Sequence, residues 1–373
     1  MPERLVIIDD NANDVQVTRR FLERRGYAVE TALSGEEGLR VVSQVMPDAV
    51  LVDYRMPVMD GFEVARRMKA DPTLQTIPVL MLTGSDQAEH IVEGLGAGAD
   101  DFVTKGVDTE VLLARLRALL RVKAYQDQLR RMNQQMTRDL QIARRVQEAL
   151  VPQRTFTSPR AEIRSAYIPS EMLSGDFYDY FLQEDRLYLF VADVSGHGLP
   201  SAILVSLLKS YIHTEADPAG SLAEFMARLN NFFYNVSLPT QFATAQLFRV
   251  AEQTLSYSNA AHPPFLLFSH ETGKTVQHEQ PGNLLGAMPD LPFEEHALAI
   301  APGDTLFVYT DGLTDRCNAN GDFYSIDRIA GLLEQTRGEE IGVVYDSIYK
   351  DVAGFLATEE FKDDIAFVLT RFR

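Results

Sequence analysis

The first 121 residues alternate short apolar runs with amphipathic stretches. Short apolar runs between turn residues are typical of buried strands, and they predict strands at 5–9, 27–32, 49–53, 78–82 and 101–105. Apolar residues three or four positions apart predict helices between them, at 12–25, 35–45, 61–70, 87–96 and 108–121. Strands that alternate with helices in this way indicate a doubly wound parallel α/β domain, whose site lies at the carboxyl ends of the strands.

A seven-residue repeat runs through the next segment, 122–155. Except at Asp139, its a and d positions are apolar or large and amphipathic: Val122, Tyr125, Leu129, Met132, Met136, Ala143, Val146 and Leu150. This seam predicts a helical coiled-coil linker that pairs two copies of the chain, because a strict 3.5-residue period favours supercoiling. Pro152 ends the predicted helix. A single amphipathic helix packed on its own domain remains the alternative.

From residue 156 onward the pattern changes to strands separated by Gly, Pro and Asn turns. Predicted strands lie at 186–193, 242–250, 253–259, 263–269 and 303–311. Longer periodic stretches predict helices at 199–214, 220–235 and near 338–356. Many antiparallel strands with few helices imply an α+β domain, a β-sandwich flanked by helices. The 373 residues therefore divide into three expected parts, 1–121, 122–155 and 156–373.

The amino-acid composition indicates the cellular compartment of the protein and excludes some classes of partner. Cys317 is the only cysteine, so there is no disulfide framework and a reducing compartment is expected. No apolar run approaches the roughly 20 residues of a membrane helix, and no signal peptide is present, so we expect a cytoplasmic protein without a membrane partner. Residues 156–373 contain 14 basic and 30 acidic residues, which argues against nucleic acid as a partner and is compatible with divalent-cation sites.

Five polar side chains stand at the ends of the first domain's predicted strands: Asp9, Asp10, Asp53, Thr83 and Lys105. Because the carboxyl ends of parallel strands form one crevice, all five are expected to converge there. Three carboxylates repel one another unless a cation is bound, so Mg²⁺ is the natural occupant. A metal-flanked aspartate can attack a phosphoryl donor, and a hydroxyl and an ammonium can bind the resulting phosphate.

The full set of motifs in this region is IIDD, LVDYRMPVMDG, LMLTG and DFVTK. Together they resemble the flavodoxin-like receiver domain of bacterial two-component response regulators over residues 1–121. The resemblance implies that Asp53 is the phosphoacceptor, served by a sensor histidine kinase or another phosphodonor. It also implies that Mg²⁺ binds to Asp10, Asp53 and the carbonyl of Arg55, with support from Asp9. The implied switch residues are Thr83, Phe102 and Lys105.

Acidic residues also adjoin strand-like runs in the third part of the chain: Asp176 in SGDFYDY, Asp193 in FVADVSGHG, Asp311 in VYTDGLTD, and Asp363 and Asp364 in KDDIAFVL. Bringing such carboxylates together is costly without compensating cations. Ligand sets made only of oxygen favour Mg²⁺ or Mn²⁺ over zinc. Two such ions about 3.5–4 Å apart can activate a bridging water for in-line attack on a phosphate ester.

The order and spacing of these motifs resemble the PPM family of metal-dependent Ser/Thr phosphatases, in its bacterial sporulation and stress-regulator branch, over residues 156–373. ARRVQEALVP, NAAHPP and GNLLG support the resemblance. It implies two Mn²⁺ or Mg²⁺ ions bridged by Asp193 and assisted by the carbonyl of Val194. The other implied ligands are Asp176, Asp311 and Asp363, with Asp364 beside them. His197 is either a general acid for the leaving oxygen or a structural residue of the glycine loop.

Both resemblances have departures. Phe102 stands where many receivers have tyrosine, and Gly106 stands where proline is usual. In the phosphatase part, Ala261 replaces a common glycine, Asp315 a frequent glutamate, and Ala366 a threonine. None of the last three is an implied metal ligand, so they bear on packing and substrate fit more than on catalysis.

The two resemblances together predict a phosphatase controlled by phosphorylation of Asp53 and dimeric through the linker. By resemblance, the substrate is a phosphorylated anti-sigma-factor antagonist protein. A non-enzymatic adaptor, whose phosphatase-like domain only binds a regulatory partner, is the main alternative. A receiver fold without phosphorylation is a second alternative. A transcription factor fits poorly, because the sequence lacks a basic recognition helix after the first domain.

Overall fold

The computed structural model describes residues 2–84, 98–106, 108–168, 170, 172–216, 220–315, 317–318, 320–356 and 364–373. The predicted helix at 87–96 and the predicted ligand Asp363 lie outside these residues. The chain forms two compact units, 1–136 and 137–373.

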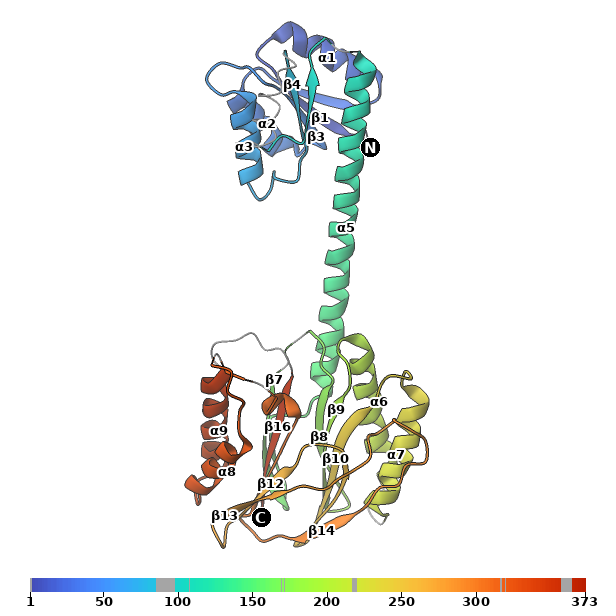
Figure 1. Ribbon diagram of the computed structural model, residues 1–373, viewed down its shortest axis with the longest axis vertical. Helices are drawn as coiled ribbons and strands as arrows, with labels where there is room; N and C mark the ends of the chain where they lie inside the picture. Colours follow the sequence, from blue (N-terminus) through green and yellow to red (C-terminus); the bar gives the residue numbers. More distant parts are fainter. Residues whose placement is uncertain are drawn as a thin grey trace. The chain divides into compact units, whose positions relative to one another are not determined.

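The first unit contains a five-stranded parallel sheet in the order β2-β1-β3-β4-β5 (Figure 1). Its strands are β1 (Arg4–Ile8), β2 (Ala28–Ala32), β3 (Ala49–Asp53), β4 (Val79–Thr83) and β5 (Asp101–Thr104). Its described helices are α1 (Ala12–Arg24), α2 (Gly35–Val45), α3 (Gly61–Ala70) and the start of α5 (Thr109–Leu150). This doubly wound fold confirms the predicted fold class, and β3 and β4 end on Asp53 and Thr83.

Apolar side chains cover both faces of this sheet. On one face, Val42 of α2 and Phe62 of α3 pack among the strand residues. On the other face, Val15 and Leu22 of α1 join Leu113 and other leucines of α5. The strands are therefore buried on both sides, which explains why they appear in the sequence as continuous apolar runs.

Helix α5 is unbroken from Thr109 to Leu150 and ends before Pro152. Its first three turns contribute to the core of the first unit through Leu113, Leu116 and Leu120. Beyond them, most of the predicted a and d side chains are exposed: Val122, Tyr125, Leu129, Met132, Met136 and Val146. The seam does not pack on its own domain, so the alternative of a self-packed amphipathic helix does not describe these residues.

The second unit contains two antiparallel sheets, in the orders β14-β11-β10-β9-β8 and β13-β12-β15-β16-β7-β6. Their strands are β6 (Thr155–Thr157), β7 (Ala161–Ile168), β8 (Asp176–Gln183), β9 (Arg186–Val194), β10 (Ala243–Ala251), β11 (Thr254–Ala260), β12 (Phe265–Ser269), β13 (Lys274–His278), β14 (His296–Ala299), β15 (Thr305–Tyr309) and β16 (Ile365–Phe372). The helices are α6 (Leu199–Glu215), α7 (Leu222–Val236), α8 (Ile326–Gln335) and α9 (Ile341–Leu356), with a 3₁₀ turn η1 (Asp311–Leu313).

The second unit has four layers. Helices α6 and α7 cover the first sheet and α8 and α9 cover the second (Figure 1). The inner faces of the sheets share a core that includes Tyr178, Phe248, Phe265 and Val368. This arrangement confirms the predicted sandwich flanked by helices. Sequence periodicity did not predict α8, whose ten residues include Gly331 in the middle.

Candidate functional sites

The carboxyl ends of β1 and β3 bring three aspartates together. Asp9, Asp10 and Asp53 offer carboxylate oxygens that all lie within 4.8 Å of one another. Asp9 and Asp53 are buried and Asp10 is exposed, so the group opens to solvent on one side. An all-oxygen set of this size suits Mg²⁺, which keeps several waters and takes a few carboxylates. The predicted convergence of these side chains is therefore present in the fold.

Lys105 connects the aspartates of this group. Its Nζ lies 2.7 Å from Asp9 Oδ2 and 2.7 Å from Asp53 Oδ1. Burial raises the pKa of Asp53 above the ordinary value, and the hydrogen bond and charge of Lys105 oppose that rise. The lysine thus stabilises the ionised carboxylate that a nucleophilic role requires.

A pocket of about 210 Å³ opens beside Asp53 and is lined by Tyr54, Arg55, Gly84 and Lys105. Thr83 is buried at the end of β4, and its carbonyl accepts a hydrogen bond from the backbone N–H of Lys105. Phe102 is buried in the core on β5. The predicted acceptor, hydroxyl and ammonium therefore lie at one end of the sheet, next to a space open to a phosphodonor.

In the second unit, Asp176 begins β8 and Asp193 lies near the end of β9. The two residues are directly paired in the antiparallel register. Opposed residues project from the same face of a sheet, with Cβ atoms about 4.5–5.5 Å apart. Like charges directly opposite are destabilising, so this pair is costly unless a cation or a proton intervenes.

The pKa of Asp176 reflects the cost of placing these two carboxylates together. Burial, followed by the charge of Asp193, raises the pKa of Asp176 well above the usual range, and the charges of Asp364 and Asp311 add to the rise. A hydrogen bond from Thr310 Oγ1, at 2.6 Å, opposes it. Thr310 directly precedes Asp311, so one short segment supplies both a hydrogen bond and a second carboxylate.

The backbone around Val194 is closely packed. Its N–H donates to the carbonyl of Gly175 at 3.1 Å. A Cβ added to Gly175 would lie 2.4 Å from the carbonyl oxygen of Val194. Only glycine permits this approach, so Gly175 allows the chain to pass close to the carbonyl that the PPM resemblance assigns to a metal.

The remaining predicted residues lie around this pair. Asp311 begins η1, and Asp364 precedes β16. Asp364 Oδ1 accepts hydrogen bonds from the N–H and hydroxyl of Ser170, at 2.6 and 3.0 Å. His197 is exposed in the turn between β9 and α6, flanked by Gly196 and Gly198, both with positive φ.

Among the described residues, the second-unit aspartates do not form a group as tight as the one at Asp53. A two-ion centre does not need such a group, because its ligands are distributed around ions about 3.5–4 Å apart. The donors that the fold brings near one another are oxygens, which fits Mn²⁺ or Mg²⁺.

His262 of the NAAHPP segment contacts the strand that is paired with Asp193. It is buried, and its Nδ1 lies 2.8 Å from the hydroxyl of Thr244, which is paired with Asp193 in the sheet register. Burial lowers its pKa to about 3, although the backbone of Tyr309 opposes the shift. The imidazole is therefore neutral and contacts β10, the strand that lies beside Asp193 in the sheet.

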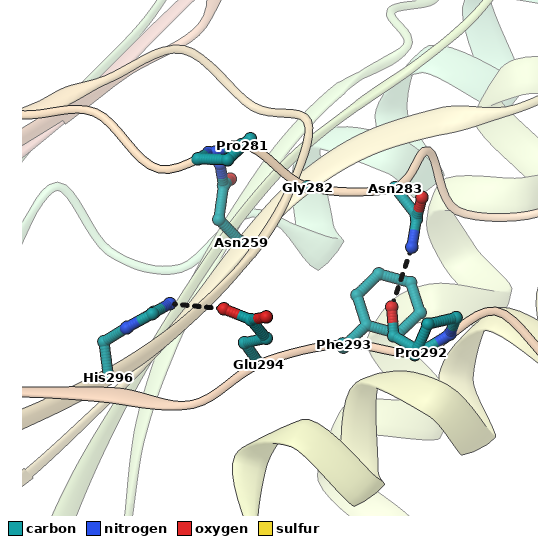
Figure 2. A pocket seen from close by; sticks show the side chains of 8 residues that line it. All are labelled: Asn259, Pro281, Gly282, Asn283, Pro292, Phe293, Glu294 and His296. Atoms are coloured by element: carbon teal, nitrogen blue, oxygen red, sulfur yellow. Dashed lines mark hydrogen bonds and ion pairs between the residues drawn. The ribbon is translucent and has the colours of Figure 1, made fainter.

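A separate pocket of about 260 Å³ lies between the segments Pro281–Asn283 and Pro292–His296 (Figure 2). Asn283 Nδ2 donates to the carbonyl of Pro292 at 2.8 Å across one side of it. The His296 imidazole points toward Glu294, 3.5 Å away. None of the predicted metal ligands lines this pocket.

Fold and site define the class of protein: a receiver domain followed by a PPM-type phosphatase domain. Residues 183–373, more than half of the chain, match the family model of Stage II sporulation protein E (SpoIIE). Residues 5–117 match the response regulator receiver domain. The chain belongs to the SpoIIE family and carries an N-terminal receiver.

Two curated relatives each match about a third of this chain. Response regulator PleD of Caulobacter vibrioides is 40% identical over 130 residues, which are 35% of this chain and 29% of PleD. Response regulator MprA of Mycolicibacterium vanbaalenii is 44% identical over 121 residues, 32% of this chain and 52% of MprA. The match thus spans about half or less of these relatives.

The SiaA-PP2C domain of Pseudomonas aeruginosa aligns with a TM-score of 0.55 at 21% identity, over 65% of this chain and 99% of that domain. At this identity the likeness establishes the fold alone. Within the described part of the chain, no helix is long and apolar enough to cross a membrane.

Proposed function

We propose that this protein is a metal-dependent phosphoprotein phosphatase whose activity is set by phosphorylation of its receiver domain. The observation that carries the proposal is the facing pair Asp176 and Asp193, with the raised pKa of Asp176, in a chain of the SpoIIE family. Two facing carboxylates repel each other, so such a pair is expected where a cation binds. Groups with a shifted pKa are also concentrated at functional sites.

In the receiver, Asp53 is the phosphoacceptor for a sensor histidine kinase or another phosphodonor. Asp10, Asp53 and the carbonyl of Arg55 hold Mg²⁺, with Asp9 in support. Lys105, already 2.7 Å from Asp53, binds the incoming phosphate oxygens, and Thr83 supplies a hydroxyl at the same strand ends. Phe102 replaces the usual switch tyrosine, so any inward movement there lacks a phenol hydroxyl.

In the phosphatase domain, Asp193 and the carbonyl of Val194 would hold the two metal ions. Asp176, Asp311 and Asp363 are the further ligands, and Asp364 accepts the hydrogen bond from the N–H of Ser170. Two Mn²⁺ or Mg²⁺ ions supply a nucleophilic hydroxide and neutralise phosphate charge when they are bound. His197, exposed beside the site, is placed to protonate the leaving oxygen or to hold its glycine turn.

The family resemblance supports a proposal for the substrate class. A phosphoserine or phosphothreonine on a small anti-sigma-factor antagonist is the proposed substrate, which would place the protein in partner switching. The exposed seam of α5 supports a homodimer through the linker. An adaptor that binds its partner without hydrolysis remains the second candidate, since the same ligands can serve a binding scaffold.

Phosphate release from a candidate antagonist phosphoprotein tests the substrate assignment. The native chain is expected to release phosphate in Mn²⁺, and Asp311→Asn is expected to be at least 100-fold slower. Release of phosphate from small aryl esters but not from any antagonist phosphoprotein would reject that substrate while keeping the phosphatase. Binding of the phosphoprotein without release, at every Mn²⁺ concentration, would favour the adaptor.

A further inference from the structure

The last turns of α5 contain one buried side chain. All residues from 121 to 150 are described, and among them only Gln147 is buried, at 5% exposure. Its neighbour Val146 is 58% exposed. A buried amide is costly unless its donor and acceptor are both satisfied, so its partners identify what this part of the helix is built to hold.

Both partners belong to one residue. Gln147 Nε2 donates to the carbonyl of Ser174 at 2.6 Å, and the N–H of Ser174 donates to Gln147 Oε1 at 3.1 Å. The side-chain amide thus pairs with the backbone in the way that a strand would. Ser174 is fully buried, so the pairing is shielded from water and is stronger than a surface contact.

Ser174 also contacts a predicted metal ligand. Its hydroxyl accepts a hydrogen bond from the N–H of Asp176 at 3.0 Å. Between them, the carbonyl of Gly175 accepts a hydrogen bond from the N–H of Val194, and the absence of a Cβ leaves room for the carbonyl oxygen of Val194. The segment that Gln147 holds therefore sets the position of the Asp176 carboxylate and of the Val194 carbonyl together.

We propose that Gln147 is a positioning residue that links α5 to the metal site, so that movement of the helix changes metal affinity. The inference rests on the proposed phosphatase function and adds its route of control. The same helix begins at Thr109 as part of the receiver core, and it is continuous to Leu150. A small rotation or slide of α5 would break both hydrogen bonds to Ser174 at once, because one side chain makes both of them.

The position of Gln147 in the heptad is compatible with this role. With Val122 as a, Gln147 falls at e, beside Val146 at d. The a and d side chains can therefore pair with the α5 helix of a second copy of the chain, while Gln147 at the e position contacts Ser174. A change in how two α5 helices pair would consequently turn Gln147 relative to Ser174.

The test uses the full chain with Gln147→Met, which keeps the length of the side chain and removes both hydrogen bonds. Gln141→Met is the matched control, because Gln141 is exposed on the same helix at an f position. Gln147→Asn, which keeps the amide but cannot reach Ser174, is the second variant in case the methionine variant unfolds. Mn²⁺ binding is measured by calorimetry, independently of turnover, and activity is measured with and without beryllofluoride. The receiver site contributes equally to all the chains compared.

We expect Gln147→Met and Gln147→Asn to bind Mn²⁺ at the phosphatase site about 10-fold more weakly, as is typical when a residue that orients a ligand is lost. We expect both to lose the beryllofluoride effect and Gln141→Met to match the native chain. Folded Gln147 variants with native Mn²⁺ affinity would overturn the inference. Weakened affinity with an unchanged beryllofluoride effect would overturn the coupling. If the native chain hydrolyses nothing but the affinity difference is found, the proposed function fails and the positioning role stands.

Discussion

Asp176 and Asp193 face each other on adjacent antiparallel strands, and Thr310, the residue that follows β15 of the other sheet, donates a hydrogen bond to Asp176. The two sheets therefore meet at a carboxylate pair that is unfavourable by itself. Binding of a divalent cation would offset the repulsion, and the stability of the domain should depend on that cation.

The raised pKa of Asp176 gives a pH dependence in the absence of metal. The folded state holds this proton more tightly than the unfolded chain does, so the stabilisation is complete below the ordinary pKa of 3.8 and is lost as the pH rises through the folded value. In EDTA, the native chain should lose unfolding free energy with rising pH more steeply than Asp176→Asn. Denaturant unfolding at several pH values measures this, and equal slopes for the two chains would contradict it. Saturating Mn²⁺ should reduce the difference between them.

Gly175→Ala should impair the site without touching a carboxylate. Its Cβ would lie 2.4 Å from the Val194 carbonyl oxygen, so the backbone must shift, at a cost of about 1–3 kcal/mol. A misplacement of this kind is expected to lower the turnover about 100-fold. Gly354→Ala is the control, since nothing lies within 4 Å of its added Cβ and it is in helix α9. That control should be stable and active, and a fully active Gly175→Ala would show that the close approach is dispensable.

Ala261 adopts a left-handed backbone conformation, with a φ of 51°. This conformation costs a residue with a Cβ roughly 1–2 kcal/mol, whereas glycine loses more freedom on folding. Ala261→Gly should therefore raise the free energy of unfolding by about 0.5–1 kcal/mol, a few degrees in Tm. Ala227→Gly, in the middle of α7, should destabilise by a similar amount. Thermal unfolding measures both changes. If the two variants are destabilised equally, the backbone at Ala261 is not strained.

The linker dimer is tested at seam positions that lie outside either core. Leu129 and Met132 are 60% and 61% exposed, so replacing both with glutamate should leave the folded chain intact. Light scattering should show a dimer for the native chain and a monomer for the Leu129→Glu, Met132→Glu double variant. Gln141→Glu, at an outward f position, should remain dimeric. A native chain that is monomeric with and without beryllofluoride would remove the coiled coil from the account.

The parallel sheet and its cluster could be predicted from the sequence because each aspartate directly follows an apolar run. Parallel strands deliver their carboxyl ends to one edge, so no register is needed to bring Asp9 and Asp53 together. The pairing of Asp176 with Asp193 depends on antiparallel register and on the packing of two sheets, which periodicity does not contain.

The same reason explains why the sequence alone does not identify three further residues of the site region, Gln147, Thr310 and Gly175. Their roles lie in contacts to Ser174, Asp176 and Val194, which become neighbours only in the folded domain. Gln147 falls beside the heptad seam and looks like one more solvated residue of a charged helix. One signal is present in the sequence: ARRVQEALVP and SGDFYDY both contribute to the resemblance to the PPM family, although nothing in the sequence connects them.

The most direct test of the central claim is hydrolysis of an aryl phosphate by the full chain as a function of Mn²⁺. Native protein and Asp193→Asn are compared, each with and without beryllofluoride. We predict metal-dependent turnover in the native chain, a loss of at least 100-fold in Asp193→Asn, and a change in the native rate when beryllofluoride binds at Asp53. Turnover that is equal in the two chains, or absent with every divalent ion, would contradict the assignment of Asp193 to a phosphatase centre.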